Sequence, residues 1–339
     1  MAETLTEAEA REASEQIARL VAELNQVLFG QESLVEHVVT GLLARGHMLL
    51  EGLPGLGKTE LVKGIAHAVR LEAKRIQFTP DLLPGDITGN PVLQDVDGQR
   101  RFVFQEGPIF ANLVLADEIN RASPKTQSAL LEAMQERRVT VMGETRMLPD
   151  PFFVLATQNP IELEGTYPLP EAQVDRFLFK LEVHRNPTPV LEKIVRHREM
   201  GVEPEVRPVL TREELLALTE RVRRIYMPEV VANYIARLVN ATHSGETDAS
   251  EGVRYGASPR AALGLSVAAR ARALLGGRIN TSFEDVQAVA VAVLQHRLVL
   301  DYHAKLEGKS GASIVEALLR EVPEQEHGLP RSLESVPST

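Results

Sequence analysis

The sequence predicts an α/β fold in which helices cover both faces of a parallel sheet, followed by a smaller all-helical domain. Three observations support this prediction. Short apolar runs alternate with helical patterns over about the first half of the chain. A glycine-rich loop separates an apolar run from a helical pattern at residues 51–64. From Thr211 to His296 the patterns are helical throughout. Alternating strands and helices are typical of parallel sheets, because each crossover helix packs on one face of the sheet.

The elements before the glycine-rich loop are mostly helical. Residues 1–28 predict one or two amphipathic helices, because apolar side chains recur there at helical spacing, at Ile17, Leu20, Val21 and Leu24. A further helix is predicted within residues 28–46. It leads into a short apolar strand at residues 47–50.

Strands and helices alternate after the loop. Helices are predicted within residues 60–70 and 123–137, and the second has Ser123 as its N-cap and Pro124 in its first turn. Strands are predicted within 73–80, 112–120 and 151–160, and residues 169–183 predict a short helix and a closing strand.

Two hairpins are predicted between these elements. Apolar positions alternate around Asp97-Gly98 in residues 91–104, and again around Gly143 in residues 137–149. Each hairpin adjoins a strand that carries candidate catalytic residues. The hairpins are therefore either surface decoration or elements that move with the site that those residues form.

The chain changes character near Asn186, where proline-rich connections begin. This change predicts an N-terminal helical segment at 1–28, an α/β domain at 29–185, a helical domain at 186–302 and a C-terminal tail at 303–339. Two capping boxes mark helix starts in the helical domain, Thr211 with Glu214 and Thr281 with Glu284.

Composition excludes several classes of protein. A formal net charge of -10 and a pI near 5.5 argue against a nucleic-acid partner, which generally requires a basic surface. The chain has no cysteine, so disulfides and thiolate chemistry are excluded. The first twenty residues are acidic and unlike a secretory signal, and no apolar run approaches the length of about 18 residues that a membrane span needs. We expect a cytoplasmic protein.

The glycine-rich loop has the pattern of a phosphate-binding loop. Residues Gly52, Gly57, Lys58 and Thr59 occupy the fixed places of G-x-x-x-x-G-K-[ST]. The loop follows an apolar strand and precedes a helix, and this context distinguishes it from a chance match. Its backbone N–H groups and the helix N-terminus would hold the phosphates of a nucleoside triphosphate. Lys58 would reach the outer phosphates, and Thr59 would place its hydroxyl on Mg²⁺.

Polar residues follow two of the predicted strands. Asp117 and Glu118 end the run "LVLADE", where one carboxylate can serve Mg²⁺ and the other can polarise the attacking water. Asn159 ends "LATQN" and is either a plain turn residue or a contact for the outer phosphate.

Two arginines are candidates for the same chemistry. Arg176 in "VDRF" is either half of a surface ion pair or an arginine donated to the nucleotide of a neighbouring subunit. Arg260 follows Ser258 and Pro259 at a helix start, where it belongs either to a well-capped helix or to a lid that touches the phosphates.

Three blocks of the sequence resemble the MoxR family of AAA+ ATPases. They are "GLPGLGKTELVK", "LADEINRASPKTQSALLEAMQERRVT" and "ATQNPIELEGTYPLPEAQVDRFLF", in the order and spacing of that family. The resemblance spans about residues 28–299 and implies an AAA+ αβα core with a helical lid. It also implies ATP hydrolysis in a ring, usually a hexamer, with active sites between subunits. The two predicted hairpins resemble the family's helix-2 insert and pre-sensor-1 insert.

The resemblance also implies roles for individual residues. Lys58 and Thr59 correspond to Walker A, Asp117 and Glu118 to Walker B, Asn159 to sensor 1, Arg176 to the arginine finger and Arg260 to sensor 2. By the same resemblance, the nucleotide would be held by Phe29, Gly30, Gln31, Pro54, Gly55, Leu56, Gly57, Lys58, Thr59, Glu60 and Asp117. Thr59 and Asp117 would hold Mg²⁺. Gln77 could restrain Glu118 until a substrate engages.

The family's proposed work is chaperone-like and involves partners that contain von Willebrand factor A domains. The alternative within the same fold is the ATPase subunit of a metal chelatase. A nucleic-acid motor or loader would need a basic pore, which Arg100 and Arg101 could supply against the acidic total. A sigma-factor activator should carry a GAFTGA-like loop, and the sequence has none. A binder without turnover is disfavoured by Asp117, Glu118 and Arg176.

Overall fold

The computed structural model describes residues 4–53, 55–96, 99–159, 165–199, 201–202 and 204–325. The chain forms two compact units. The first consists of Met1–Tyr226 with Arg270–Ile279, and the second of Met227–Ala269 with Asn280–Thr339. Within the described ranges, no helix is both long and apolar enough to cross a membrane.

The first unit is built on a five-stranded parallel sheet. Its strands, in spatial order, are β2 (Ala73–Gln77), β5 (Leu113–Asp117), β8 (Phe153–Gln158), β1 (Met48–Glu51) and β9 (Phe179–Glu182). In the register, Gln77 pairs with Asp117, and Leu50 pairs with Thr157. Because the strands are parallel, the loops that follow them begin along one edge of the sheet. The predicted α/β class is confirmed.

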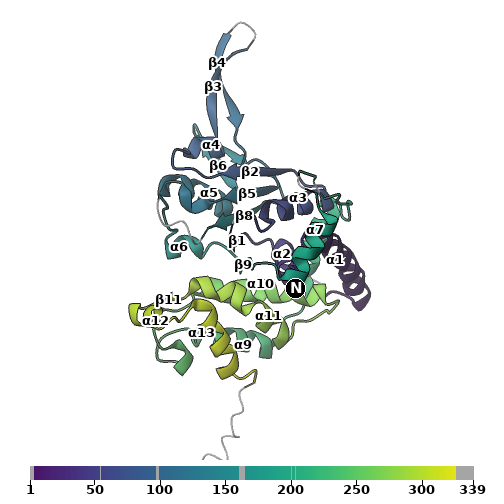
Figure 1. Cartoon of the computed structure of the whole chain (residues 1–339), viewed down its shortest axis with the longest axis vertical. Coiled ribbons are helices and arrows are strands. Elements are labelled where there is room, and N and C mark those ends of the chain that lie inside the picture. The colour runs from purple at the N-terminus through teal and green to yellow at the C-terminus, as the bar shows by residue number, and fades with distance from the viewer. Residues whose placement is uncertain are drawn as a thin grey trace, which may run out of the picture. The chain divides into compact units, whose positions relative to one another are not determined.

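Helices cover both faces of this sheet, with α5 and α6 on one side and α1, α2, α3 and α7 on the other (Figure 1). The central strands β5 and β8 are therefore almost wholly buried and apolar. The helices of this unit are α1 (Glu7–Val27), α2 (Glu32–Leu43), α3 (Lys58–Ala68), α4 (Pro84–Thr88), the 3₁₀ turn η1 (Ile119–Arg121), α5 (Pro124–Glu136), α6 (Glu171–Val174), α7 (Thr188–His197) and α8 (Arg212–Arg224).

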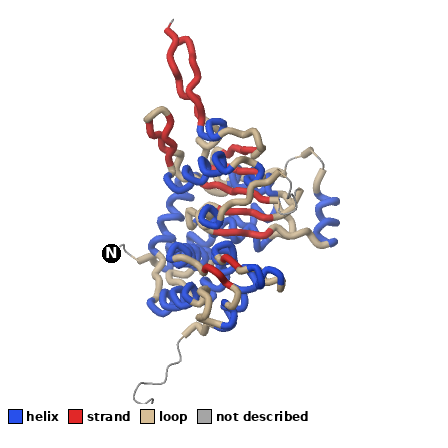
Figure 2. The backbone as a smooth tube through the Cα atoms, turned by 90° about the vertical axis from the view of Figure 1, so that its left-hand side faces the viewer, coloured by secondary structure: helices blue, strands red, loops and turns tan. Residues whose placement is uncertain are grey.

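Both predicted hairpins are present, and Figure 2 shows them projecting from the same end of the sheet domain. One consists of β3 (Gly89–Val96) and β4 (Gln99–Glu106), and the other of β6 (Arg138–Val141) and β7 (Glu144–Met147). Residues 97–98, at the first turn, lie outside the described residues. The guanidinium of Arg146 lies 4.3 Å from the ring centroid of Phe104, so a cation–π contact joins the two hairpins.

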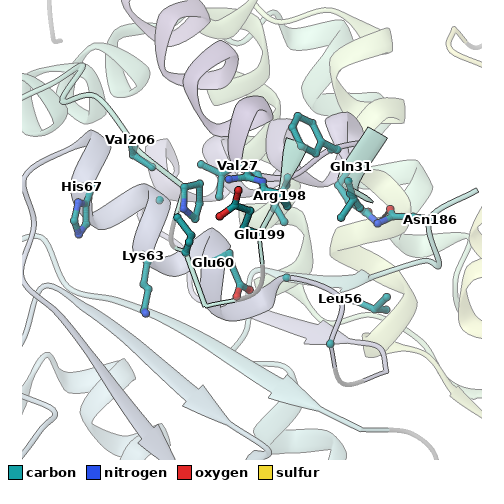
Figure 3. Close-up of a pocket in the computed structure, with 18 of the residues that line it drawn as sticks. Val27, Gln31, Leu56, Glu60, Lys63, His67, Asn186, Arg198, Glu199 and Val206 are labelled. Carbon is teal, nitrogen blue, oxygen red and sulfur yellow. Dashed lines mark hydrogen bonds between the residues drawn. The ribbon is translucent and has the colours of Figure 1, made fainter. Parts of the chain in front are cut away.

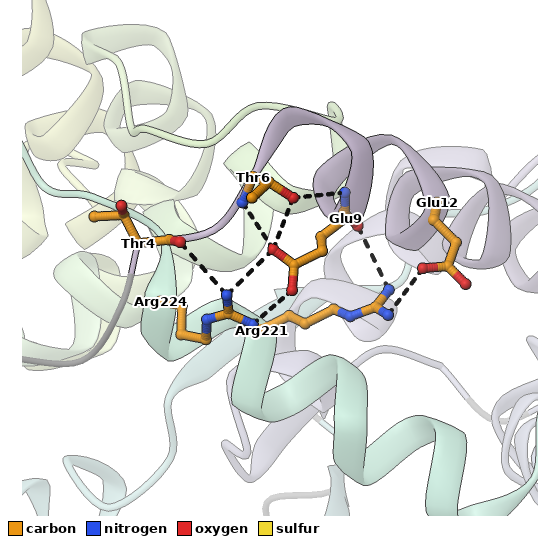
Figure 4. A network of polar contacts seen from close by, with 6 residues as sticks. All are labelled: Thr4, Thr6, Glu9, Glu12, Arg221 and Arg224. Atoms are coloured by element: carbon orange, nitrogen blue, oxygen red, sulfur yellow. Dashed lines mark hydrogen bonds and ion pairs between the residues drawn. The ribbon is translucent and has the colours of Figure 1, made fainter.

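The N-terminal helix α1 packs into the first unit. Its apolar face is fully buried, as Ile17, Leu20 and Leu24 show. Its first turn has a capping box, and two glutamates of α1 pair with two arginines of α8, as Figure 4 shows. Glu9 lies 2.9 Å from Arg224, and Glu12 lies 2.9 Å from Arg221.

The end of α7 also contacts α1, because Nη2 of Arg198 donates to the carbonyls of Gln26 and Val27 at 2.6 and 2.9 Å. These contacts place α7 and α8 in the first unit. The sequence pattern instead indicates a boundary near Asn186. The difference arises because the proline-rich segment changes composition without ending the packing.

The second unit is mostly helical. Its elements are α9 (Glu229–Asn240), η2 (Asp248–Ser250), β10 (Val253–Tyr255), α10 (Pro259–Leu275, which belongs to the first unit from Arg270), α11 (Phe283–Leu294), η3 (Gln295–Arg297), β11 (Val299–Leu300), α12 (Tyr302–Leu306) and α13 (Gly311–Glu321). The helical pattern expected throughout Thr211–His296 is wrong at β10, which pairs antiparallel with β11. Gly252, at φ +86°, interrupts the helical path immediately before this strand.

One of the two predicted capping boxes is correct. At the start of α8, Thr211 and Glu214 form the expected box. At the start of α11 the prediction is wrong by one residue, because the box consists of Ser282 and Asp285. Thr281 is instead buried, and its hydroxyl donates to the sulfur of Met227.

Candidate functional site

The glycine-rich loop forms the N-terminus of α3. Gly55 and Gly57 have φ values of +80° and +82°, which side chains other than glycine rarely adopt. A Cβ on Gly57 would lie 2.6 Å from Leu28, so the turn also has no room for a larger residue. No side chain caps the start of α3. Its first N–H groups are therefore suited to an anion, and Thr59 lies in this turn. Pro54 lies outside the described residues.

Lys58 is the first residue of α3, and its side chain folds back over the loop. Its Nζ donates a 2.9 Å hydrogen bond to the carbonyl of Gly52. Burial lowers the pKa of Lys58, while the carboxylates of Asp117 and Glu118 act in the opposite direction. Lys58 is thus a partly desolvated cation close to both acids, as the phosphate-loop prediction requires.

The two acids at the end of β5 are held by one threonine of β8. The Thr157 hydroxyl donates to Oδ1 of Asp117 at 2.6 Å and accepts the N–H of Glu118 at 2.8 Å. Glu118 has a φ of +56°, a conformation that costs a non-glycine residue about 1–2 kcal/mol. The bond to Thr157 offsets this cost and sets the direction in which Glu118 leaves the strand.

Neighbouring side chains also donate hydrogen bonds to the carboxylate oxygens Oδ2 of Asp117 and Oε2 of Glu118. Nε2 of Gln77 donates to Oε2 of Glu118 at 2.7 Å, so the expected contact is confirmed, while its action as a switch stays a prediction. Arg121 donates to the same oxygen of Glu118 at 3.0 Å. Arg75 donates to Oδ2 of Asp117 at 2.6 Å.

A cavity of about 540 Å³ lies beside the loop (Figure 3). This volume is in the usual range for small-molecule sites. Among the residues predicted to bind nucleotide, six line it, namely Phe29, Gln31, Gly55, Leu56, Gly57 and Glu60. Gln31 anchors this wall, because its Nε2 donates to the carbonyl of His184 at 2.9 Å and to Oδ1 of Asn186 at 3.0 Å. Gly30 has a φ of +70° and packs against Val190.

Several residues of this cavity carry no sequence motif. They come from α3, from α7 and from the segments on either side of α7, and include Lys63, His67, Asn186, Ile194, Arg198 and Glu199. Arg198 and Lys193 lie over the ring of Phe29, at 5.1 and 4.5 Å from its centroid. The only feature of the sequence that could have indicated these cavity residues is a basic cluster at the end of α7, "KIVRHR", next to the expected domain boundary.

Three predicted site residues, Asn159, Arg176 and Arg260, do not line this cavity. Asn159 directly follows β8 at the same edge of the sheet and is 8% exposed. Arg176 lines a second cavity of about 320 Å³ that shares no residue with the first, and it donates to the carbonyl of Leu131 at 2.8 Å. Arg260 is an exposed residue of α10 in the second unit, and its assignment as sensor 2 stays a prediction.

The donors near the loop fit magnesium held with a nucleotide. Among the described residues, no three or more His, Cys, Asp or Glu side chains gather into a metal-binding group. Mg²⁺ in phosphate sites is usually held by one or two protein oxygens, with phosphates and waters completing its shell. Thr59 and Asp117 are oxygen donors of this kind.

Two family models match this chain. The model of the ATPase family associated with various cellular activities (AAA) matches residues 47–179, and the AAA lid domain model matches residues 245–318. Chaperone MoxR1 of Mycobacterium tuberculosis is 44% identical over 326 residues, which is 93% of this chain and 86% of that protein.

Two further relatives match over most of their length. The uncharacterized protein YeaC of Bacillus subtilis is 42% identical and covers 90% of this chain and 94% of its own length. A crystal structure from Cytophaga hutchinsonii aligns with a TM-score of 0.86 at 40% identity, covering 94% of this chain and 97% of that one.

Proposed function

Because this chain belongs to the MoxR family of AAA+ ATPases, we propose that it hydrolyses ATP between neighbouring subunits of a ring, usually a hexamer, and uses the cycle to remodel or mature partner proteins. One observation carries this proposal. The phosphate loop, Lys58, Asp117 and Glu118 meet at one edge of the sheet, beside a cavity large enough for a nucleoside.

Each group at this edge has a chemical task in the proposed reaction. The cavity beside Phe29 takes the adenosine, and the N-terminus of α3 takes the phosphates. Lys58 neutralises the outer phosphates, and Thr59 and Asp117 hold Mg²⁺, which when bound neutralises charge on the phosphate oxygens. Glu118 polarises the attacking water, and Asn159 contacts the outer phosphate or that water.

The position of Arg176 supports a site shared between subunits. Arg176 belongs to the same unit as the loop, yet it lines a separate cavity. We infer that its guanidinium serves the nucleotide of a neighbouring subunit. An arginine donated in this way accelerates phosphoryl transfer about 10³- to 10⁵-fold, so a monomer would be nearly inactive.

The proposed client is a protein. The relative in M. tuberculosis is named a chaperone. A net charge of -10 disfavours a nucleic-acid track. By resemblance to the family, the partner contains a von Willebrand factor A domain, and a metal-chelatase role is the alternative within the same fold.

A mixing experiment tests the shared site. Arg176→Ala subunits keep the loop and lack the donated arginine, whereas Lys58→Ala subunits lack the loop lysine and still carry Arg176. Each variant alone should be almost inactive. Adding excess Lys58→Ala subunits should restore part of the turnover to Arg176→Ala protein. The double variant Lys58→Ala/Arg176→Ala is the matched control and should restore none. Wild-type activity that stays linear down to the monomer would count against the ring.

A second experiment identifies the client. Glu118→Gln protein should bind ATP and hydrolyse it very slowly, so it accumulates the ATP-bound form. Affinity purification with this variant in ATP, and with Lys58→Ala as the control, should enrich a protein with a von Willebrand factor A domain. Recovery of DNA in place of a protein would favour a nucleic-acid motor.

A further inference from the structure

Arg75 contacts one acid of the candidate site, Asp117, directly and is linked to the other, Glu118, through Gln77. It is on β2, two residues before Gln77, so both side chains are on the same face of the strand. Its Nη2 and Nε donate to Oδ2 of Asp117 at 2.6 and 3.2 Å. The same Nη2 donates to Oε1 of Gln77 at 2.5 Å.

The contact with Arg75 fixes the orientation of the Gln77 amide. Because Oε1 of Gln77 accepts from Arg75, its Nε2 is turned to the other side, where it donates to Oε2 of Glu118 at 2.7 Å. The four side chains therefore form one continuous chain of polar contacts, in the order Asp117, Arg75, Gln77 and Glu118. This chain joins the proposed metal ligand to the proposed activator of water.

We propose that Arg75 is a positioning residue that couples the metal site to Glu118. This inference rests on the proposed function. A divalent cation and the guanidinium compete for the same carboxylate, Asp117. When the cation takes Asp117, Arg75 loses its charged partner, and the Gln77 amide loses the contact that aims it at Glu118. The contact of Gln77 with Glu118, the carboxylate that polarises water, is then released when the cation binds.

The exposure of Arg75 sets the size of the effect. The Arg75 side chain is 53% exposed, whereas that of Asp117 is 15% exposed. An ion pair of this kind is partly screened by water. Removing it should therefore change the competition for Asp117 by about two- to fivefold, within the range measured for exposed pairs.

The first test is the magnesium dependence of ADP binding, measured by calorimetry with Mg²⁺ and with EDTA. In Arg75→Met, the ratio of the Kd in EDTA to the Kd in Mg²⁺ should rise about two- to fivefold, because the competitor is gone. Lys74→Gln removes a neighbouring positive charge that pairs with Glu72, and it should leave the ratio as in the wild type. An unchanged or smaller ratio in Arg75→Met overturns the proposal. Failure of wild type to bind ADP at all overturns the proposed function as well.

The second test separates coupling from independent effects. Gln77→Leu and Arg75→Met should each raise basal turnover, since each interrupts the series of polar contacts from Asp117 to Glu118 that restrains the Glu118 carboxylate. If the two residues act in series, the double variant should be no faster than the faster single variant. Arg75→Lys keeps the charge but lacks the guanidinium that reaches both Oδ2 of Asp117 and Oε1 of Gln77. Its basal turnover should therefore lie between those of the wild type and Arg75→Met. Effects of the two single variants that multiply in the double variant overturn the proposal.

Discussion

The Oγ1 hydroxyl of Thr157 donates a 2.6 Å hydrogen bond to Oδ1 of Asp117, across the boundary between β8 and β5. Thr157 is fully buried, and it also accepts the N–H of Glu118. One hydroxyl therefore orients the side chain of one acid and the backbone of the other. A buried group with two partners of this kind leaves both unsatisfied when it is removed.

We predict that Thr157→Val impairs both stability and turnover. Valine has nearly the same shape but no hydroxyl, so the partly buried Glu118 N–H loses its partner, at a cost of about 1–3 kcal/mol in the free energy of unfolding. Loss of such a supporting contact should lower ATP turnover about 10- to 100-fold. Urea denaturation and steady-state hydrolysis measure the two effects.

Thr157→Ser is the matched control, because it keeps the hydroxyl and should retain most of the turnover. If Thr157→Val is less stable but hydrolyses ATP at the wild-type rate, the hydroxyl serves the fold alone.

The parts of the site that were predictable share one property, which is that the residues that define each part lie close together in the sequence. The phosphate loop requires glycines and a lysine at fixed spacing, and Asp117 and Glu118 interrupt an apolar strand at its end. The hairpins also carry their own alternation and turn residues. In each case the physics that dictates the residue type acts within about ten positions.

Thr157, Arg75 and Arg198 were not predictable for the opposite reason. Each acts on residues far away along the chain, because Thr157 contacts Asp117 40 positions earlier and Arg198 contacts Gln26 172 positions earlier. A threonine in a strand or an arginine after a helix is ordinary on its own. Only the strand order and the docking of α1 bring such pairs together.

We predict that Arg198→Met weakens nucleotide binding. The guanidinium satisfies the last carbonyls of α1, at Gln26 and Val27, and lies 5.1 Å from the ring centroid of Phe29 in the proposed adenosine cavity. A cation–π contact and a charged hydrogen bond are together worth about 1–3 kcal/mol, so the Kd for ADP should rise about 5- to 150-fold.

Arg196→Met provides a control on the same helix. Arg196 pairs with Glu192, and both side chains are more than half exposed. Calorimetry should give this variant the wild-type Kd. An equal loss of affinity in both variants would indicate a general effect of charge on α7 and not a role for the Arg198 contacts.

We predict that Glu9→Gln loosens α1 at neutral pH. Hydrogen bonds from Arg224 and from the backbone of Thr6 lower the pKa of Glu9 to about 2, from an ordinary value of 4.5. A carboxyl with a lowered pKa stabilises the fold above its unfolded pKa, and this contribution is lost as the pH falls through 4.5 towards 2. Hydrogen exchange should therefore be faster in α1 of Glu9→Gln at pH 7, and the difference from wild type should shrink near pH 2–3.

Glu7→Gln is the control for this effect, because Glu7 is in the same first turn and makes none of the contacts drawn in Figure 4. It removes one charge near the helix N-terminus and should leave exchange in α1 close to wild type. A difference between wild type and Glu9→Gln that persists undiminished at pH 2 would show that the ionised Glu9 carboxylate does not dock α1.

His47 makes the stability of the sheet domain depend on pH in the same direction through a different cause. Its Nδ1 accepts the Val154 N–H at 3.0 Å, so its Nε2 carries the proton and donates to the Met134 carbonyl at 3.0 Å. Burial lowers the pKa of His47 from 6.5 to about 4, and a second proton would displace the Val154 bond. The unfolded chain therefore binds a proton near pH 6.5 that the folded chain takes up only near pH 4. As the pH falls from 6.5 to 4, this difference lowers the free energy of unfolding by about 3 kcal/mol. The free energy of unfolding of His47→Gln should be lower than that of the wild type at pH 7. Because its side chain cannot titrate, this variant should also lack the decline towards pH 4. A ring that titrates near pH 6.5 in an NMR experiment on the folded wild-type protein would contradict the buried, neutral state.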